Sequence, residues 1–531
     1  MKKNLLAISL VTISCLYGIL AAVIILVFAV TNMPITYGII LSIIIIILQF
    51  LVAPTLNDFI FKHFYKMKFN QPIPEYLELF IRESCERHNM KYPKIGFIDD
   101  GSPNAFTYGR TKNDARVVIT RGILNLLTED EVKAVVAHEL GHANHYDMLF
   151  MTVAQVVPLL LYYVSEILLK TNSRSSSRNN DNGNYLATIG FVSYLLYILS
   201  QYIILWLSRT REYYADYFAI EETQNPAGLG NALVKIGFGL AVGNKKEDSK
   251  MSKGNALGIN NAKISKGMAL GSYNNGGVSK ENIVNAMKWE RWNLWAKWNE
   301  LNSTHPLISK RLLAIAQQSE RYGQEPYIVF NEQKTESYVD DFLIEVFLSI
   351  LPLLIVIITF IVCIINVNNA LLIGGIGGLL FTASLFILLN RTHKNKDYKH
   401  TNVEELLGQV KVSNITSIPC ILEGKIIGRG NPGCIFNEDF VLQDETGIIF
   451  LDYNQPVHIV EKIFAIFKSK EYFDKKVRVK GWYRRSLAPY IELYSIEIDG
   501  KEKKCHTYNT VRIIYGIMMA VSIYCIVKSF I

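Results

Sequence analysis

Long apolar runs are the most regular feature of the hydrophobic pattern along the chain. A helix needs about 20 consecutive apolar residues to cross the hydrocarbon core of a bilayer. Runs of about this length predict seven membrane spans, at residues 5–30, 35–52, 148–169, 185–207, 342–367, 370–389 and 511–531. The first run follows Lys2 and Lys3, as in a signal peptide, but it is too long for one and leads almost directly into the second run. We therefore interpret it as a retained anchor.

The third and fourth spans are less uniformly apolar than the others. They carry Gln155, Glu166 and Gln201. Polar side chains inside a membrane segment face other helices or a watery cavity. These two runs can therefore form either a pair of complete spans or a partly buried hairpin.

The positive charge predicts how the chain lies in the membrane. Lys and Arg number 55 against 47 Asp and Glu, so the net charge is +8. Lysines and arginines follow spans two, four and six, whereas the loops after spans one and five carry no charge. By the positive-inside rule, the N-terminus and the soluble segments lie in the cytoplasm. The loop between spans three and four disagrees, because it holds Lys170, Arg174 and Arg178. Nucleic-acid binding is the less favoured explanation of the positive balance.

The seven cysteines do not form a metal-binding pattern. None belongs to a C-x-x-C pair, and several lie in the apolar runs. An odd number of scattered cysteines predicts reduced thiols, in agreement with a cytoplasmic location.

The predicted spans divide the chain into five parts. These are a membrane hairpin at 1–56, a soluble domain at 57–341 that includes the hairpin 148–207, a hairpin at 342–390, a soluble domain at 400–505 and a last span at 511–531. Residues 243–277 are rich in Gly, Asn, Ser and Lys and predict a mobile loop. Residues 280–301 carry four tryptophans at three-residue spacing, which predicts a packed or membrane-surface helix.

The strongest chemical signal is the motif His-Glu-Leu-Gly-His at residues 138–142, after the acidic residues 129–131 that are typical of a helix start. A spacing of four places His138 and His142 on one helical face, where both imidazoles can bind one metal ion. Glu139, one residue after His138, is displaced toward the side where a metal-bound water would lie. A zinc ion lowers the pKa of such a water, and a carboxylate can then take its proton. We predict one Zn²⁺ per chain, although cobalt or manganese would fit the same ligands in vitro.

A catalytic zinc of this kind needs a third protein ligand. Glu212 and Asp216 are again four residues apart on a predicted helix. Glu212 can bind the metal, and Asp216 can accept the distal N–H of a ligating histidine, with His138 the preferred partner. The alternative is that Glu212 forms an exposed ion pair with Arg209 or Arg211.

These motifs together resemble the HtpX-type membrane proteases, gluzincins whose family includes the eukaryotic CAAX prenyl protease. The matching strings are residues 103–109, 138–147, 208–216 and 303–306 with Arg311 after them. The resemblance implies that His138, His142 and Glu212 bind zinc and that Glu139 is the general base. It also implies that His305 stabilises oxyanion charge, that Arg311 orients the site, and that Asp147 and Asp216 support the ligands.

The segment 104–106 is expected to bind substrate. Asn104, Ala105 and Phe106 match the edge-strand motif of that family and precede an apolar β run at 116–120. An extended substrate could add to such an edge through its backbone, without much reading of its side chains. An ordinary hairpin is the alternative.

The C-terminal part has no counterpart in the smaller HtpX-type proteins. Short strands are predicted at 419–427, 439–444, 448–453, 476–482 and 490–498, with a helix at 457–468. Five strands with a helix before the fourth are typical of an OB-fold barrel. Binding of single-stranded nucleic acid through residues such as Arg478 and Trp482 is disfavoured against a protein-docking or membrane-proximal role, and a purely structural role is favoured most.

The predicted fold class is mainly α: a multi-span helical membrane protein with a gluzincin-type α+β metalloprotease domain and a C-terminal OB-like β-barrel. The predicted function is a zinc-dependent endopeptidase of the cell membrane, cutting misfolded or surplus membrane proteins at the cytoplasmic face. The alternatives are a CAAX-type processing protease and a non-enzymatic scaffold that recruits partners through the barrel. Neither the substrates, the regulation nor the oligomeric state follows from the sequence.

Overall fold

The computed structural model divides the chain into two compact units. It describes residues 2–531 except 32–34, 102, 175–180, 243–272, 275–276, 279, 331–335, 396, 430–438, 458–460, 462–468 and 487–488. The first unit contains residues 1–240 and 300–329, and the second contains residues 263–299 and 330–531. Most of the predicted mobile loop at 243–277 and of the predicted helix at 457–468 lies outside the described residues.

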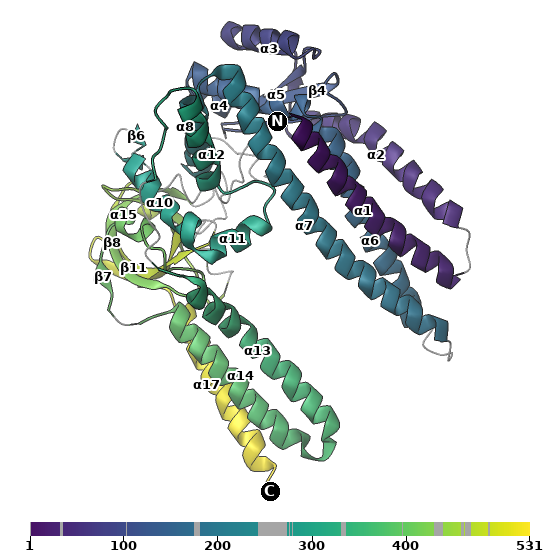
Figure 1. Ribbon diagram of the computed structural model, residues 1–531. Coiled ribbons are helices and arrows are strands. Elements are labelled where there is room, and N and C mark those ends of the chain that lie inside the picture. The colour runs from purple at the N-terminus through teal and green to yellow at the C-terminus, as the bar shows by residue number, and fades with distance from the viewer. Residues whose placement is uncertain are drawn as a thin grey trace. The chain divides into compact units, whose positions relative to one another are not determined.

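The first unit consists of long helices and a small mixed sheet (Figure 1). Its helices are α1 (Lys2–Thr31), α2 (Ile35–Phe64), α3 (Glu75–Arg87), α4 (Arg121–Leu126), α5 (Glu129–Asn144), α6 (Asp147–Arg174), α7 (Asp181–Thr223), α8 (Pro226–Val242) and α12 (Ile308–Arg321). Its strands are β1 (Lys68–Phe69), β2 (Lys94–Ile98), β3 (Ala105–Gly109) and β4 (Ala115–Thr120).

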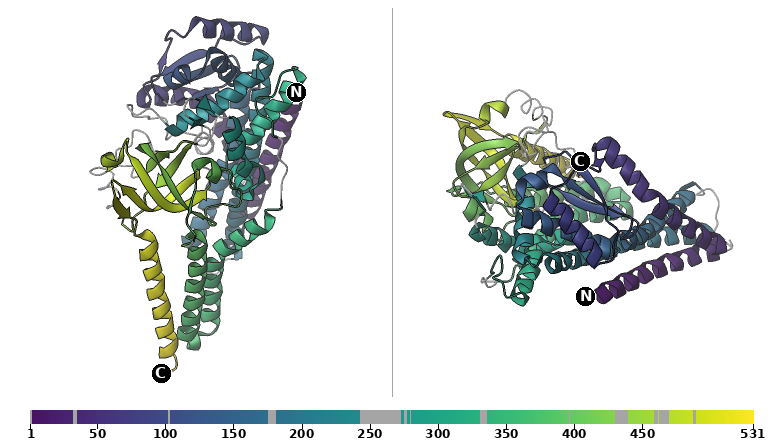
Figure 2. Two further views of the ribbon diagram at one scale, coloured as in Figure 1. Left: turned by 90° about the vertical axis from the view of Figure 1, so that its left-hand side faces the viewer. Right: turned by 90° about the horizontal axis from the view of Figure 1, so that it is seen from above.

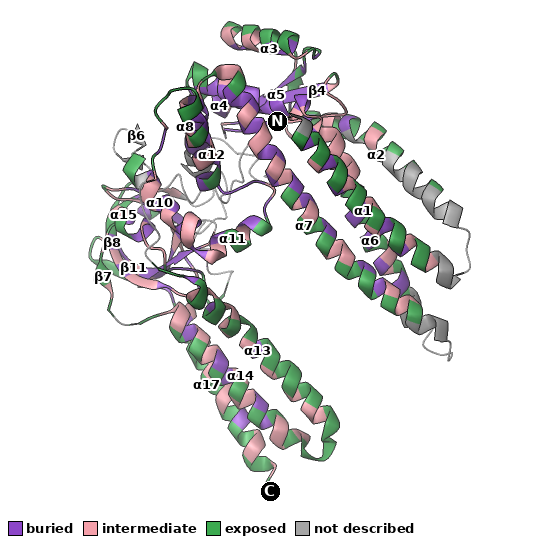
Figure 3. Ribbon diagram, in the orientation of Figure 1, coloured by how far each residue is buried: buried purple, intermediate pink, exposed green. Residues whose placement is uncertain are grey.

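The long helices of the first unit pack through an apolar core. Leu16 and Leu20 of α1, Val157 and Leu161 of α6 and Ile204 of α7 form one buried cluster. The opposite faces of these helices expose apolar side chains, which suits a lipid environment (Figure 3). The helices therefore have both a packed side and a side that needs a hydrocarbon solvent.

Six helices among the described residues are long and apolar enough to cross a membrane. They cover Asn4–Val27, Asp147–Lys170, Tyr185–Thr223, Val339–Ile365, Val367–Thr392 and Thr507–Lys528, and they correspond to six of the seven predicted spans. The remaining predicted span, 35–52, lies in α2, where many side chains are outside the described residues. The fourth span continues beyond its predicted end at 207, because α7 is one unbroken helix of 43 residues.

The four-stranded sheet has the order β1-β2-β4-β3, so β3 lies at an edge, as the sequence predicted for residues 104–106. β3 pairs antiparallel with β4, with Ala105 opposite Ile119 and Phe106 opposite Val118. The Oγ1 atom of Thr107 donates to the backbone carbonyl of Glu139 at 3.1 Å. This bond attaches the edge strand directly to α5.

Helix α5 begins at Glu129 and has the expected acidic first turn. The carboxylate of Glu131 accepts from the backbone N–H of Thr128 at 2.9 Å and pairs with Lys235 at 2.8 Å. A side chain that returns to the N-cap backbone satisfies one of the unpaired donors at a helix start. Because nearly every residue from Val132 to Ala143 is buried, α5 is the central helix of the first unit.

The second unit contains three long apolar helices and a β-barrel (Figure 1). Its helices are α10 (Lys280–Trp292), most of α11 (Leu294–Leu301), α13 (Val339–Ile365), η3 (Val367–Asn369), α14 (Ala370–Thr392), α15 (Val403–Leu407), η4 (Ser469–Tyr472) and α17 (Thr507–Lys528). Its strands are β5 (Tyr273–Asn274), β6 (Gly277–Val278), β7 (Lys399–His400), β8 (Ile418–Arg429), β9 (Phe440–Gln443), β10 (Ile448–Asp452), β11 (Lys476–Arg485), β12 (Pro489–Ile498) and β13 (Lys501–Lys504). Figure 2 shows α13, α14 and α17 extending from the barrel on one side.

Five strands of this unit form the closed barrel. They follow the order β10-β9-β8-β11-β12, and a parallel pairing of β10 with β12 closes the ring. All five match predicted strands to within three residues at each end. The sequence analysis missed two short additions, β7 beside β8 and β13 beside β12. The assignment to the OB-fold stays a prediction.

The predicted tryptophan-rich helix is broken into two. α10 ends at Trp292 and α11 begins at Leu294. Between them, Asn293 accepts from the backbone N–H of Trp295 at 2.8 Å and donates to the carbonyl of Val410 at 2.8 Å. The prediction of a single helix over 280–301 was therefore wrong. The side chain of Asn293 bonds to backbone groups of Trp295 and Val410, and the helix is interrupted at this residue.

Candidate metal centre

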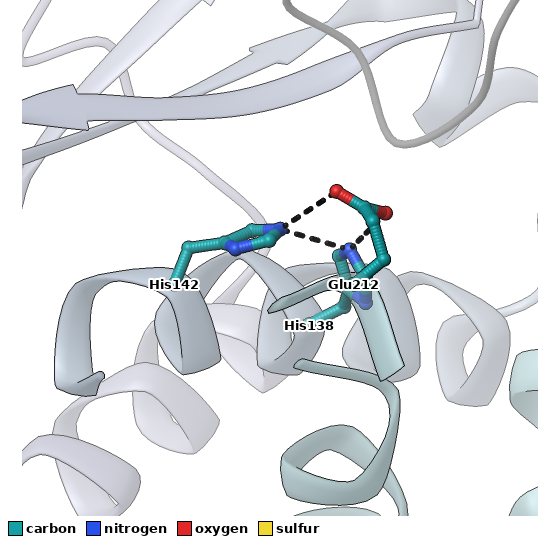
Figure 4. A group of neighbouring side chains, drawn as sticks. All are labelled: His138, His142 and Glu212. Atoms are coloured by element: carbon teal, nitrogen blue, oxygen red, sulfur yellow. Dashed lines mark hydrogen bonds and ion pairs between the residues drawn. The ribbon is translucent and has the colours of Figure 1, made fainter. Parts of the chain in front are cut away.

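Two helices bring three potential metal ligands together. His138 and His142 project from α5, and Glu212 projects from α7 toward them (Figure 4). The Nε2 atoms of the two histidines are 3.1 Å apart, and each lies 3.6 Å from an oxygen of Glu212. These atoms form the group of potential ligands found among the described residues.

The spacing of these atoms fits a zinc ion. Tetrahedral zinc with bonds of about 2.0–2.1 Å to nitrogen and oxygen separates its ligand atoms by about 3.3 Å. The two imidazole nitrogens are 3.1 Å apart, and each lies 3.6 Å from a different oxygen of Glu212, so all three distances are near that value. The ligand set, two imidazoles and one carboxylate, is typical of catalytic zinc.

Carboxylates behind the two histidines turn both rings toward the same point. Asp216 Oδ1 lies 2.9 Å from Nδ1 of His138, and Asp147 Oδ2 lies 2.7 Å from Nδ1 of His142. A proton held on each Nδ1 leaves both Nε2 atoms with their lone pairs. Two lone pairs facing each other at 3.1 Å repel unless a cation lies between them. The structure thus places Asp216 and Asp147 where the sequence analysis expected supporting residues.

Replacement of Asp147 by asparagine is expected to weaken zinc binding about 10- to 100-fold, because loss of such a supporting carboxylate loosens the ligand's orientation. Zinc affinity can be measured by competition with a chromogenic chelator. Asp130→Asn on α5 is the matched control, since the Asp130 side chain is 70% exposed. Equal zinc affinities in the two variants would show that Asp147 does not support His142.

Arginines balance the buried carboxylates. Arg311 donates to both oxygens of Asp216, at 2.8 and 2.6 Å, and its side chain is fully buried. Arg211 pairs through Nη2 with one oxygen of Asp147 and also donates to the carbonyl of His145 at 3.0 Å. Arg311 is therefore placed to orient the site, whereas Arg211 supports a different carboxylate. The alternative pairing of Glu212 with Arg209 or Arg211 does not occur among the described residues: Arg211 pairs with Asp147, and Arg209 donates to the carbonyl of Glu300.

The surrounding carboxylates also raise the pKa of two basic side chains, His142 of α5 and Arg311 of α12. Burial lowers the pKa of His142, but the hydrogen bond that His142 donates to Asp147 and the charge of Glu212 outweigh it and raise that pKa to about 9. Burial likewise opposes the charge on Arg311, and the neighbouring Asp216 restores it by raising the pKa of the guanidinium. A metal that binds here must therefore displace a proton from the site.

Glu139 lies beside the ligands and beside the edge strand. Its side chain is 2% exposed, and its charge contributes to the raised pKa of His142. The bond from Thr107 of β3 reaches the backbone carbonyl of the same residue. Glu139 is thus a buried acid whose charge acts on His142 and whose backbone is bonded to the strand expected to hold substrate.

His305 reaches the site from the loop before α12. Its Nδ1 lies 3.1 Å from Glu212, and its Nε2 is buried without a hydrogen-bond partner among the described residues. Arg209 holds this loop by donating to the carbonyls of Glu300 at 2.7 Å and Ser303 at 2.8 Å. The sequence analysis missed this role of Arg209, although its position three residues before Glu212 was a usable signal.

The comparisons with known proteins agree with this geometry. The sequence pattern of peptidase family M48 matches residues 74–319. A protease HtpX homolog of Methanothermobacter thermautotrophicus is 37% identical over 189 residues, which are 36% of this chain and 68% of that protein. One of Campylobacter hominis is 31% identical over 198 residues, covering 36% of this chain and 70% of the relative. The crystal structure of S. mikatae Ste24p aligns over 58% of this chain and 65% of its own, with 20% identity and a TM-score of 0.34.

The fold and the site together define a zinc metallopeptidase with several candidate membrane spans. The chain belongs to peptidase family M48. Proteins are therefore its class of substrate, and zinc is its cofactor.

Proposed function

We propose that the chain cuts internal peptide bonds of misfolded or surplus membrane proteins at the cytoplasmic face of the cell membrane. The convergence of His138, His142 and Glu212 beside the buried Glu139 and the edge strand β3 is the observation that carries this proposal. When bound, zinc supplies a Lewis acid that polarises the scissile carbonyl and acidifies water. The chain's own residues position the substrate and move the proton.

Strand β3 is proposed to bind the substrate backbone. In an antiparallel pair, residues bonded to the partner strand alternate with residues whose backbone groups point away from it. The backbone N–H of Thr120 donates to the carbonyl of Asn104 at 3.0 Å. By this alternation, the backbone groups of Phe106, two residues further along β3, also point toward β4. The backbone groups of Ala105 and Thr107 are then directed to the free edge. A substrate paired there is read through its main chain, which suits many unrelated unfolded proteins.

Glu139 is proposed as the general base that accepts a proton from the attacking water and passes it to the leaving nitrogen. His305 is proposed to donate from Nε2 to the negative charge that develops on the carbonyl oxygen. Its position fits this role, because Nε2 has no partner among the described residues and Nδ1 is held beside Glu212. Asp147, Asp216 and Arg311 are proposed to keep these groups in place.

His305→Gln is expected to lower kcat by about 10²–10³-fold without loss of zinc, because one oxyanion donor has about this effect. The kinetics of a fluorogenic peptide and the zinc content of the same sample would be compared. His63→Gln, which removes an exposed histidine of α2, is the matched control. If His305→Gln instead releases zinc, His305 belongs to the ligand set and the proposed role is wrong.

The proposed domains are a membrane hairpin at 1–56, a peptidase domain at 57–341 including the hairpin 148–207, a hairpin at 342–390, an OB-like domain at 400–505 and a last span at 511–531. The OB-like domain is proposed to dock protein partners rather than nucleic acid. Side chains of both charge signs line its surface groove, among them the basic Lys425 and Arg478 and the acidic Glu423 and Asp444. A groove for single-stranded nucleic acid is expected to be mainly positive.

The test of the proposed function uses the detergent-solubilised chain, stripped of metal and reloaded with zinc. Unfolded casein and a destabilised membrane protein are the substrates, with a folded soluble protein as the control. We expect zinc-dependent cuts at many internal bonds of the first two only. Cleavage restricted to a short C-terminal segment of a lipidated peptide would favour the CAAX-type processing activity. Reloaded protein that cuts none of them would favour a scaffold.

The membrane side can be tested separately with protease digestion of oriented vesicles. The proposal places the peptidase domain and the barrel in the cytoplasm. Inside-out vesicles are therefore expected to lose both to added trypsin, and right-side-out vesicles are expected to protect them. The reverse pattern would overturn the proposed orientation and leave the peptidase chemistry untouched.

A further inference from the structure

A small cavity lies in the second unit, where α13 begins and α14 ends. Its volume is about 220 Å³. Its lining combines three cations, two acids, three aromatic rings and two other polar residues: Arg391, Lys394, Lys411, Asp341, Glu345, Trp295, Tyr338, Phe342, Asn293 and Thr416. Because α13 and α14 form an antiparallel hairpin of candidate spans, this end of the hairpin is a boundary between hydrocarbon and water.

Two of the cations are available to an anion. Arg391 donates from Nε to the hydroxyl of Thr416 at 3.0 Å, and its two other guanidinium nitrogens have no partner within the part of the chain that the structure describes. The ammonium group of Lys394 likewise has no side-chain partner there. Lys411 is different, because it pairs with Glu336 at 2.8 Å and lies 3.6 Å from Asp341.

Of the two acids in the cavity, Asp341 lies near Lys411, whereas Glu345 has no cationic partner among the described residues. Glu345 is 5% exposed and accepts a hydrogen bond from the indole nitrogen of Trp295. No Lys, Arg or His among the described residues forms an ion pair with it. A buried carboxylate is costly unless a positive charge or several donors compensate it. The rings of Trp295 and Phe342, whose centroids are 4.9 Å apart, add aromatic surface of the kind that attracts ammonium groups.

We propose that this cavity binds the headgroup of an aminophospholipid, a lipid whose phosphate and primary ammonium are joined by a short linker. The phosphate lies against Arg391 and Lys394, and the ammonium lies against Glu345 and Trp295. The acyl chains follow α13, which exposes Leu343 at 59% and Phe347 at 56% beside the cavity. A lipid with a purely anionic headgroup fits less well, because Glu345 opposes it. This inference concerns the second unit and does not rest on the proposed peptidase function.

Native mass spectrometry of the full-length protein can test the site. The delipidated protein would be titrated with phosphatidylethanolamine, phosphatidylglycerol, phosphatidylcholine and inorganic phosphate in separate samples. We expect one tightly retained phosphatidylethanolamine per chain and weaker retention of the others. Lys394→Gln and Glu345→Gln are each expected to reduce its affinity about tenfold, the effect of losing one charge-assisted hydrogen bond. Lys528→Gln, at the exposed end of α17, is the matched control.

The variants keep the test decisive. Glutamine at position 345 retains an oxygen for the Trp295 indole, and Lys394 is exposed, so at least the second variant is expected to fold. Equal retention of phosphatidylethanolamine by the wild type and Lys394→Gln would overturn the proposal. So would equal retention of phosphatidylglycerol, which would point to positive charge alone, or full displacement by inorganic phosphate, which would leave the ammonium side without a role.

Discussion

Glu139→Gln is expected to lower the rate of peptide hydrolysis by about 10²–10⁴-fold while the zinc content stays unchanged. Glutamine has nearly the shape of glutamate but cannot accept the proton of the attacking water. Glu139 is 2% exposed, and its backbone is bonded to β3. Among the described residues placed at the site, no other acid lies between the ligand group and β3. The rate of cleavage of a fluorogenic peptide and the zinc content per chain would be measured on the same preparations.

Glu129→Gln provides the matched control for this experiment. Glu129 lies on the same helix, in its exposed first turn, so the substitution removes an equal charge at a distance from the ligands. It is expected to change the rate by less than about threefold. A Glu139→Gln variant that keeps a comparable rate with zinc bound would show that another group takes the proton.

Arg311→Met is expected to have the largest effect on stability. Arg311 is fully buried and forms two hydrogen bonds with Asp216, which is itself 1% exposed. Removing one partner of a buried ion pair leaves the other charge uncompensated and costs about 3–5 kcal/mol. A loss of this size is expected to lower the midpoint of thermal unfolding of the detergent-solubilised protein by roughly 10 °C.

A compensating variant separates charge from packing. In the double variant Arg311→Met with Asp216→Asn, no buried charge is left unpaired, so a substantial part of the stability is expected to return. Zinc affinity is expected to remain low, because Asp216 no longer orients His138 as an anion. Arg321→Met, at the exposed end of the same helix, is the control. If Arg311→Met and Arg321→Met unfold at the same temperature, the buried pair does not contribute as argued.

The ligand group could be predicted because helical periodicity determines it locally. His138 and His142 are one helical turn apart, and Glu212 and Asp216 are one turn apart on another helix. Each pair therefore shares a face whatever the rest of the chain does. The apolar runs and the alternating strands of the barrel are equally local signals, and the structure contains both.

Contacts between distant segments could not be predicted in the same way. Arg209 was interpreted from its charge, but its bonds to Glu300 and Ser303 join residues more than 90 positions apart. The break at Asn293 has the same origin, since it depends on carbonyls contributed by Val410 and Val412. No periodicity within 280–301 contains information about those partners.

The continuous helix α7 is a further case. The sequence analysis ended the fourth span at 207, where charged residues follow the apolar run. The helix continues to Thr223 because Arg209, Arg211 and Glu212 all find buried partners in the first unit. Charge alone indicates where the bilayer ends, but not where the helix ends.

The most direct test of a zinc peptidase built on His138, His142 and Glu212 is a titration of activity with zinc. Purified wild-type protein, stripped by a chelator, would receive zinc in fractional steps, and cleavage of an unfolded substrate would be measured at each step. The predicted result is no cleavage without zinc and a linear rise that ends at one zinc per chain. Cleavage by the metal-free protein would contradict the assignment. So would a rise in activity that does not follow the amount of zinc bound by these three residues.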